Sequence, residues 1–277
     1  ELMWYLTGRD DVEFISKYSK QWAPLSDDGI HNNSAYGKYS LNKMPAIGFG
    51  SEYDKPYEEY VADKNNYRSQ WEFVKETLYD DQELHCEVAK LKMDFMTRAQ
   101  SLIHGDLHTG SVFINKESTK VFDPEFCFYG PMGYDIGNVI ANMIFAWANG
   151  DAAGADEFCS WVESVLVDVV NMTKEKMEKY YEEHVTDTMC KNELYRKYYM
   201  ATIIEDTSAV TGLELIRRIV GMANVKDITS IEDEAKRARA EKICITAAVD
   251  FIKNRGDKKC GKCFLGTLKD AIAKVDA

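Results

Sequence analysis

Two short motifs carry carboxylates at positions that could transfer a phosphoryl group. They are residues 104–111 (HGDLHTGS) and 123–125 (DPE). Phosphoryl transfer needs one carboxylate to receive and orient the attacking hydroxyl, and oxygen ligands that hold Mg²⁺ on the nucleotide phosphates. Asp106 is suited to the first role, and Asp123 and Glu125 are suited to the second. The residue types therefore indicate a kinase active site that uses ATP and Mg²⁺.

A hairpin between the two motifs is expected to bring them together. Residues 112–114 (VFI) and 120–122 (KVF) are short apolar stretches on either side of a turn-like segment, 115–119. Because a hairpin returns the chain to its starting point, we expect Asp106 and Asp123 to lie at the same open end. There they could share one metal-phosphate site.

The motifs depart from the pattern of protein kinases, which is His-Arg-Asp followed after four residues by Asn, and then Asp-Phe-Gly. Gly105 replaces the arginine, Ser111 stands at the asparagine position, and Pro124-Glu125 replaces Phe-Gly. A serine hydroxyl is a weak ligand for Mg²⁺, whereas a second carboxylate is a good one. We therefore predict that Glu125 restores the metal coordination that is lost at Ser111.

The combination of Ser111 with Glu125 resembles the methylthioribose kinase family, within the aminoglycoside phosphotransferase and kinase-like superfamily. Two further blocks are similar to that family, residues 126–137 (FCFYGPMGYDIG) and 214–228 (ELIRRIVGMANVKDI). The similarity extends from about residue 80 to the C-terminus. It implies ATP-dependent phosphorylation of 5-methylthioribose to 5-methylthioribose 1-phosphate, a step of methionine salvage, and it also implies a homodimer.

The resemblance implies roles for individual residues. Asp106 would accept the proton of the anomeric hydroxyl, and Arg217 and Arg218 would form the arginine pair of the substrate site. Asp135 would bond to the backbone of the catalytic loop, although it could also simply cap the helix that follows. His104 would support the loop by hydrogen bonding. Two adjacent arginines on a helix are otherwise most often a solvated face, so only the whole combination carries these assignments.

Phe113 and Phe122 flank the motifs, where apolar side chains commonly form the floor of an adenine pocket. The alternative is that both rings belong to the core of the hairpin, and the sequence favours this simpler interpretation.

Composition limits the class of protein. The chain has 277 residues, a formal net charge of −12 and 45% hydrophobic residues. It can therefore bury a substantial core, and its acidity argues against nucleic acid as a partner. No apolar run is long enough to span a membrane, and the first residues lack the pattern of a secretory signal. Seven scattered cysteines favour a reducing cytoplasm. The pair Cys260 and Cys263 lacks the partners that a zinc or redox motif usually has, so we expect neither role.

Apolar periodicity predicts a mainly helical chain. The clearest stripe runs over residues 81–102 and consists of Leu84, Val88, Leu91, Phe95, Ala99 and Leu102. Another helix is expected to begin at Asp135, a turn is expected over 150–154, and further helices are expected over 155–184, 190–210 and 231–254. The predicted fold class is α+β, namely the mainly helical C-terminal lobe of a protein-kinase-like fold with a short β-hairpin at the catalytic loop.

The domain organisation is expected to be a loop-rich and helical leading segment over residues 1–80 and a catalytic lobe over 81–277. The segment 48–51 (GFGS) is not interpreted as a phosphate-binding loop, because no strand-like run precedes it and no lysine-bearing strand follows. A nucleotide-covering N-terminal lobe is therefore expected to be absent, and the chain alone to be inactive. Two alternatives stay open: a kinase for an aminoglycoside, choline or another sugar, and an inactive lobe that binds a partner.

Overall fold

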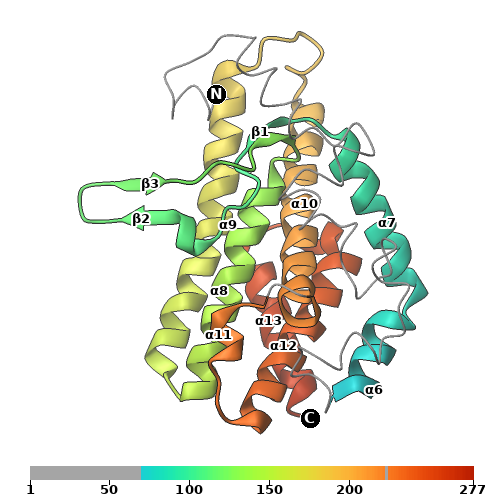
Figure 1. Cartoon of the computed structure of the whole chain (residues 1–277). Helices are drawn as coiled ribbons and strands as arrows, with labels where there is room; N and C mark the ends of the chain where they lie inside the picture. The colour runs from blue at the N-terminus through green and yellow to red at the C-terminus, as the bar shows by residue number, and fades with distance from the viewer. Residues whose placement is uncertain (1–69, 222–223) are drawn as a thin grey trace.

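The computed structural model describes residues 70–221 and 224–277, and helices dominate this part of the chain (Figure 1). The α-helices are α6 (Trp71–Val74), α7 (Gln82–Thr97), α8 (Gly133–Ala153), α9 (Asp156–His184), α10 (Glu193–Val220), α11 (Lys226–Thr229), α12 (Glu234–Lys253) and α13 (Gly261–Val275). A π-helical turn, Lys75–Tyr79, and two 3₁₀ turns, Thr109–Ser111 and Arg255–Asp257, complete them. None of the described helices combines the length and apolarity needed to cross a membrane. The helix and loop expected within residues 1–69 lie outside the described residues.

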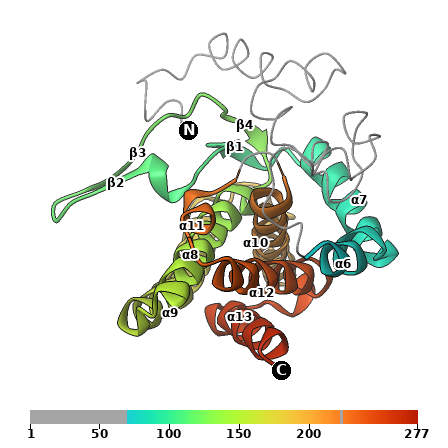
Figure 2. The same ribbon diagram turned by 60° about the horizontal axis from the view of Figure 1, so that its bottom comes forward.

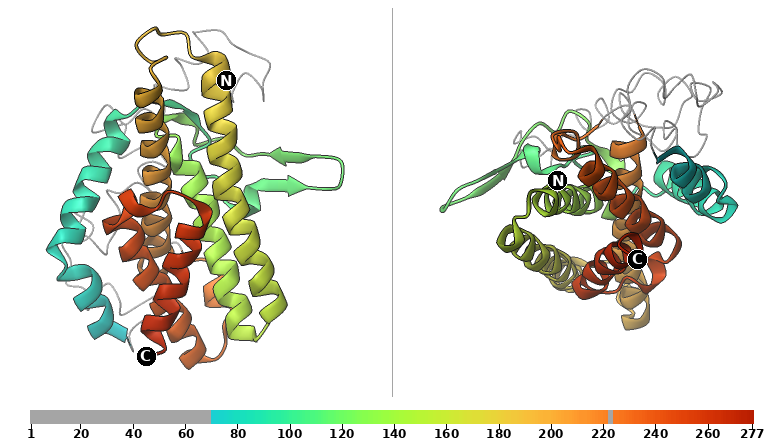
Figure 3. Two further views of the ribbon diagram at one scale, coloured as in Figure 1. Left: turned by 180° about the vertical axis from the view of Figure 1, so that it is seen from behind. Right: turned by 90° about the horizontal axis from the view of Figure 1, so that it is seen from below.

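The long helices form a closed ring in which α8, α9, α13, α12 and α10 each contact the next, and α10 contacts α8 again (Figures 2 and 3). The apolar faces of these helices meet inside the ring. Ile140, Ile144 and Phe145 of α8 are fully buried there, and the rings of Phe251 and Phe264 lie 5.3 Å apart between α12 and α13. This ring of helices supports the candidate catalytic loop, residues 104–111, which lies near one end of α8 and α10 (Figure 1).

Helix α10 is longer than the sequence predicts, because it runs to Val220 rather than to residue 210. Gly212 would normally weaken a helix interior. Here a Cβ atom at Gly212 would lie 2.5 Å from the carbonyl oxygen of Ala248 on α12. The glycine is therefore the residue that lets α10 and α12 pack closely, and the helix continues through it. As a result, Arg217 and Arg218 lie on this helix.

Four short strands surround the catalytic loop in two antiparallel pairs (Figure 1). Strand β1 (Ser101–Ile103) pairs with β4 (Phe128–Gly130), and β2 (Val112–Ile114) pairs with β3 (Thr119–Val121). The β2–β3 pair confirms the predicted hairpin, with Val112 opposite Val121.

The predicted helix over residues 81–102 is wrong at its C-terminal end. Helix α7 begins after Asp81, whose side chain accepts from the N–H of Leu84, and ends at Thr97. Leu102 belongs instead to β1, where it lies opposite Tyr129. Its helical spacing in the sequence is coincidental, because backbone pairing with β4 determines the conformation of this segment.

The start of α8 also differs from the prediction. The helix begins at Gly133 with Met132 as its N-cap residue, so Asp135 lies in the first turn and is not the cap. The turn expected over 150–154 is wrong for its first residues, since the helix continues to Ala153 and only Gly154, with φ of 73°, ends it.

One acidic side chain on α12 is buried. Glu241 is 4% exposed and accepts a hydrogen bond from the Nε2 of Gln70, 2.6 Å from its Oε2. The Nε of Arg237 lies 4.0 Å from its Oε1. Burial raises the pKa of Glu241 to about 7, and Arg237 and Gln70 oppose the shift.

This raised pKa predicts a pH-dependent loss of stability. The folded state binds a proton more tightly than the unfolded state, so the free energy of unfolding falls as pH rises from about 4.5 to about 7. The loss is about 3 kcal/mol when Glu241 is fully ionised. Glu241→Gln should abolish it, because the neutral amide stays buried and can donate to the Oε1 of Gln70, a buried atom without a partner among the described residues.

Urea unfolding at pH 5 and pH 8 measures this difference directly. Glu241→Gln should unfold at clearly higher urea than the parent at pH 8 and at a similar concentration at pH 5. The control is Glu175→Gln, an exposed position on α9, which should follow the parent at both pH values. Equal pH dependence in the parent and in Glu241→Gln would contradict the prediction.

Candidate active site

The catalytic loop follows β1 and begins with a tight backbone turn. Gly105 has φ of 83°, and a Cβ atom at this position would lie 2.1 Å from the carbonyl oxygen of Phe126. Only glycine satisfies both conditions, since other residues rarely adopt such a φ and would collide with this carbonyl. The turn therefore presses the loop against residues 123–127 and leaves Asp106, half-buried, immediately after it.

Asp135 fixes this loop from the first turn of α8. Its Oδ2 accepts from the N–H of His104 at 2.6 Å, and its Oδ1 accepts from the N–H of Gly105 at 3.0 Å. Burial raises the pKa of the Asp135 carboxyl, while the N–H groups of His104, Gly105 and Leu107 oppose the shift. The bond to the loop that the family resemblance implied for Asp135 is thus present in the structure.

His104 is buried and uses both ring nitrogens for support. Its Nε2 lies 2.9 Å from the carbonyl oxygen of Phe122, and its Nδ1 accepts from the N–H of Asp106 at 3.3 Å. A carbonyl can only accept, so Nε2 donates to it and Nδ1 accepts. This arrangement links the catalytic loop to the residue that follows β3. A supporting role fits this geometry better than proton transfer.

Ser111 and His108 lie beside Asp106. The Oγ of Ser111, which is buried, lies 3.2 Å from the Nε2 of His108. The same Nε2 lies 4.0 Å from the Oδ2 of Asp106. The Ser111 hydroxyl therefore has a protein partner, which is consistent with a limited role in holding a metal ion.

Asp123 and Glu125 follow the hairpin and are both exposed. Bonds from the N–H of Phe122 to the carbonyl of Ser111, at 3.1 Å, and from His104 to Phe122 hold this segment beside the catalytic loop. Asp123 has φ of 68° and is the one non-glycine residue with positive φ among those described. Such a conformation is uncommon outside glycine and is concentrated at functional sites. The described residues contain no preformed group of three acidic, histidine or cysteine ligands.

Phe113 and Phe122 form a stacked pair on the hairpin. Their ring centroids lie 4.3 Å apart with an interplanar angle of 13°, and Phe113 is 64% exposed. A hairpin core residue would be covered, whereas this pair presents an open aromatic surface next to Asp123. The interpretation of these rings as a simple hairpin core is therefore not supported by their exposure.

The two arginines of α10 share one buried carboxylate. Glu214 accepts from the Nε and Nη2 of Arg217 at 2.6 and 2.8 Å, and from the Nε of Arg218 at 2.7 Å. Arg217 is buried rather than part of a solvated face. Burial alone would raise the pKa of Glu214, but Arg217 and Arg218 outweigh it and hold that pKa below its usual range. Burial alone would lower the pKa of Arg217. The carboxylate of Glu214, with a smaller contribution from Asp106, outweighs burial and raises that pKa above its usual value. Asp106 thus lies within electrostatic reach of Arg217.

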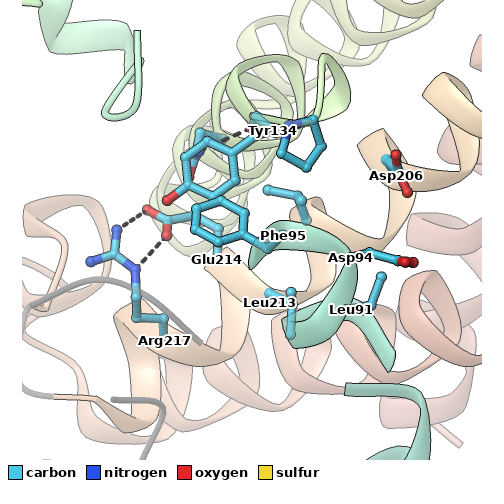
Figure 4. Close-up of a pocket in the computed structure, with 11 residues that line it drawn as sticks. Leu91, Asp94, Phe95, Tyr134, Asp206, Leu213, Glu214 and Arg217 are labelled. Carbon is cyan, nitrogen blue, oxygen red and sulfur yellow. Dashed lines mark hydrogen bonds and ion pairs between the residues drawn. The ribbon is translucent and has the colours of Figure 1, made fainter. Parts of the chain in front are cut away.

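A pocket opens beside this ion pair, between α7, α8 and α10 (Figure 4). Apolar and aromatic side chains make up most of its wall, with polar groups at Asp94, Asn138, Asp206, Glu214 and Arg217. The Glu214 carboxylate and the Arg217 guanidinium pair next to the ring of Tyr134. Burial raises the pKa of Asp206 to about 6, although the Nη1 of Arg98, 2.6 Å from its Oδ2, opposes the shift.

Sequence reasoning missed Glu214 and the pocket. Glu214 precedes Arg217 and Arg218 by three and four positions, which is the spacing of ion pairs on a helix, so a signal for it existed. The pocket had none, because its wall combines residues from α7, the start of α8 and α10 that are far apart in the sequence.

The chain is similar to known proteins over part of its length. Residues 42–163 match the family described as phosphotransferase enzymes. Methylthioribose kinase 1 of Oryza sativa is 38% identical over 195 residues, 64% of this chain and 45% of the relative. Methylthioribose kinases of Bacillus pumilus and Escherichia coli are 33% and 32% identical over 194 and 218 residues, covering 70% and 73% of this chain and 48% and 52% of the relatives. The chain thus spans about half the length of these relatives. The chain is therefore similar to methylthioribose kinases over about half of their length, and part of it matches the phosphotransferase enzyme family.

Proposed function

We propose that this chain supplies the catalytic loop of a kinase that transfers the γ-phosphoryl group of ATP to 5-methylthioribose and forms 5-methylthioribose 1-phosphate, in methionine salvage. The observation that carries the proposal is the loop itself, in which Gly105, His104 and Asp135 fix the backbone that leads into Asp106. The similarity to plant and bacterial methylthioribose kinases supports the choice of substrate. A cytoplasmic location and a homodimer belong to the same proposal, from cysteine usage and from the family.

Each site residue has a role in this proposal. Asp106 orients the anomeric hydroxyl and accepts its proton as the new bond to phosphorus forms. Arg217 and Arg218 donate to hydroxyl and phosphoryl oxygens, and Glu214 holds their guanidinium planes. The aromatic pair Phe113 and Phe122 offers a surface on which an adenine ring can stack. The pocket beside Arg217 offers the apolar wall that a methylthio group requires.

The donor set fits Mg²⁺ bound together with a nucleotide. Mg²⁺ usually takes one or two protein carboxylates, and phosphate oxygens and water complete its octahedron. Asp123 and Glu125 provide two exposed carboxylates beside the catalytic loop, and a third protein ligand is not needed. When bound, the ion would neutralise negative charge on the phosphates. Asp123 and Glu125 would hold it.

The metal assignment predicts a selective effect at Glu125. Glu125→Gln should raise the Mg²⁺ concentration for half-maximal activity by about 10- to 100-fold, because a neutral amide oxygen replaces a charged carboxylate ligand. Ser111→Asn combined with Glu125→Gln should recover part of the loss, because an asparagine oxygen is a better Mg²⁺ ligand than a serine hydroxyl. The measurement is activity against Mg²⁺ concentration, with Glu117→Gln in the hairpin turn as the control. An unchanged Mg²⁺ requirement in the single variant would refute the idea.

The substrate is tested with a panel of acceptors. We expect ADP release with 5-methylthioribose and little with ribose, choline or an aminoglycoside. The assay is performed on the chain alone and on the chain fused behind the N-terminal lobe of a methylthioribose kinase. The chain alone spans about half the length of its relatives and is expected to be nearly inactive. Much of phosphoryl-transfer catalysis is positioning of the phosphates, to which the rest of those relatives would contribute. Robust ADP release by the chain alone would mean that residues 1–69 supply those contacts, and preference for another acceptor would refute the substrate.

A further inference from the structure

Two cysteines lie side by side at the start of α13, in elements that carry none of the proposed active-site residues. Cys260 is the N-cap residue of this helix, and Cys263 lies in its first turn. Their Sγ atoms are 3.0 Å apart, which is about 1 Å longer than a disulfide bond. All seven cysteines lie among the described residues, and no other two of them are in sulfur–sulfur contact. The side chains of both are partly exposed, so a small molecule can reach them.

The first turn of α13 holds this pair in place. The N–H of Gly261 donates to the Oδ1 of Asn171 on α9 at 2.9 Å. A Cβ atom at Gly261 would lie 2.3 Å from the carbonyl oxygen of Val167, so the turn is packed directly against α9. Phe264, the next residue after Cys263, is fully buried. The backbone that carries the two cysteines is therefore held in place, with the two sulfur atoms about 1 Å beyond bonding distance.

The surroundings favour the thiolate form of Cys263. The hydrogen bond with Cys260 lowers the pKa of Cys263, and the N–H groups of Lys259 and Cys260 and the charge of Lys258 act in the same direction against burial. A thiolate, rather than a thiol, is the nucleophile in exchange reactions. Cys263 is therefore the attacking sulfur, and Cys260 is positioned to complete the reaction.

We propose that Cys260 and Cys263 form a redox-active dithiol that undergoes exchange with low-molecular-weight disulfides such as oxidised glutathione. The Cys263 thiolate attacks one sulfur of the disulfide, forms a mixed disulfide and releases one thiolate. Cys260 then loses its proton to solvent and attacks the Sγ of Cys263, which closes the Cys260–Cys263 bond and releases the second thiolate. The two cysteines are oxidised, and one small disulfide is reduced to two thiols.

A metal site is a poorer explanation of the pair. Structural zinc sites use four ligands, and the described residues contain no group of three acidic, histidine or cysteine side chains that could hold a metal ion. The dithiol needs no further ligand. The sequence alone gave no reason to expect a redox role, because the sulfur–sulfur distance and the neighbouring N–H groups are properties of the folded chain.

The test is to equilibrate the purified chain in glutathione buffers of increasing oxidised fraction, block the remaining thiols and map the peptides by mass spectrometry. The peptide with Cys260 and Cys263 should lose two hydrogens and resist blocking. Cys86, which is exposed on α7, is the internal control and should form only a mixed disulfide with glutathione. The proposal is overturned if the pair stays fully reduced in buffers in which Cys86 has reacted.

Two variants assign the roles of the sulfurs. Cys260→Ser should accumulate glutathione on Cys263, because the resolving thiol is missing. Cys263→Ser should react several-fold more slowly, because the sulfur assigned as the attacking nucleophile is missing. Thermal unfolding of both variants checks that α13 stays folded. Equal reaction rates for the two variants, or tight binding of Zn²⁺ by the reduced parent that blocks exchange, would overturn the proposal.

Discussion

Replacing Asp106 with asparagine is expected to lower the turnover number by about 10²- to 10⁴-fold while the fold and ATP binding are retained. The reason is that an amide oriented at the same place cannot accept the proton of the sugar hydroxyl. Folding should be little affected, because the loop is held by backbone bonds. The N–H of Asp106 donates to His104, and Asp135 accepts from the two preceding N–H groups. None of these bonds involves the Asp106 carboxylate.

The experiment compares Asp106→Asn with Asp168→Asn, an exposed position on α9 that receives the same chemical change. Both variants are prepared in the fused form, and ADP release, ATP binding and thermal unfolding are measured for each. Asp168→Asn should match the parent in all three measurements. If Asp106→Asn kept most of its turnover, the assignment of the proton acceptor would be wrong. Loss of ATP binding together with activity would instead assign Asp106 to the nucleotide.

Replacing Glu214 with glutamine is expected to lower the free energy of unfolding by about 3–5 kcal/mol at pH 7. The substitution removes the one carboxylate that accepts from both Arg217 and Arg218, and it leaves the buried Arg217 guanidinium without its counter-charge. Breaking one side of a buried ion pair costs more than never having formed it, because the remaining charge stays removed from water.

The pH dependence of this effect has a defined sign. The arginines hold the pKa of Glu214 below its usual range in the folded state, so the ion pair stabilises the protein above about pH 4.5. That stabilisation is lost as pH falls through the folded-state pKa. The gap in unfolding free energy between the parent and Glu214→Gln should therefore be largest near neutral pH and should narrow in acid.

Urea unfolding at pH 7 and pH 4 checks both parts of this prediction. The matched control is Glu205→Gln on the same helix, a half-buried position whose carboxylate forms no ion pair with the described residues. In the fused form, Glu214→Gln should also raise the KM for 5-methylthioribose more than the KM for ATP, since the arginines belong to the sugar side of the proposed site. Unfolding equal to that of the control would mean that Glu214 does not hold the arginines in solution.

Local sequence was sufficient for the parts of this protein that depend on neighbouring residues. The hairpin between the two motifs could be predicted because its apolar stretches and its turn lie within about ten residues of one another. The order of the acidic motifs predicts the kind of chemistry for a similar reason, since Asp106, Asp123 and Glu125 come from the two ends of that hairpin. The long amphipathic helices followed from their periodicity, with errors mainly at their ends.

Only the tertiary structure decided how these pieces are held. The residues 99–102 continue a helical pattern, yet Leu102 lies in a strand because β4 returns to pair with it. Asp135 has the sequence context of a helix cap, yet its carboxylate bonds to the loop 30 residues before it. Two adjacent arginines such as Arg217 and Arg218 usually lie on a solvated helix face, yet Glu214 and Arg217 are buried where α10 packs within the ring of helices. Each outcome depends on contacts between segments that are distant in the sequence, and their free energy outweighs the local preference of the residues involved.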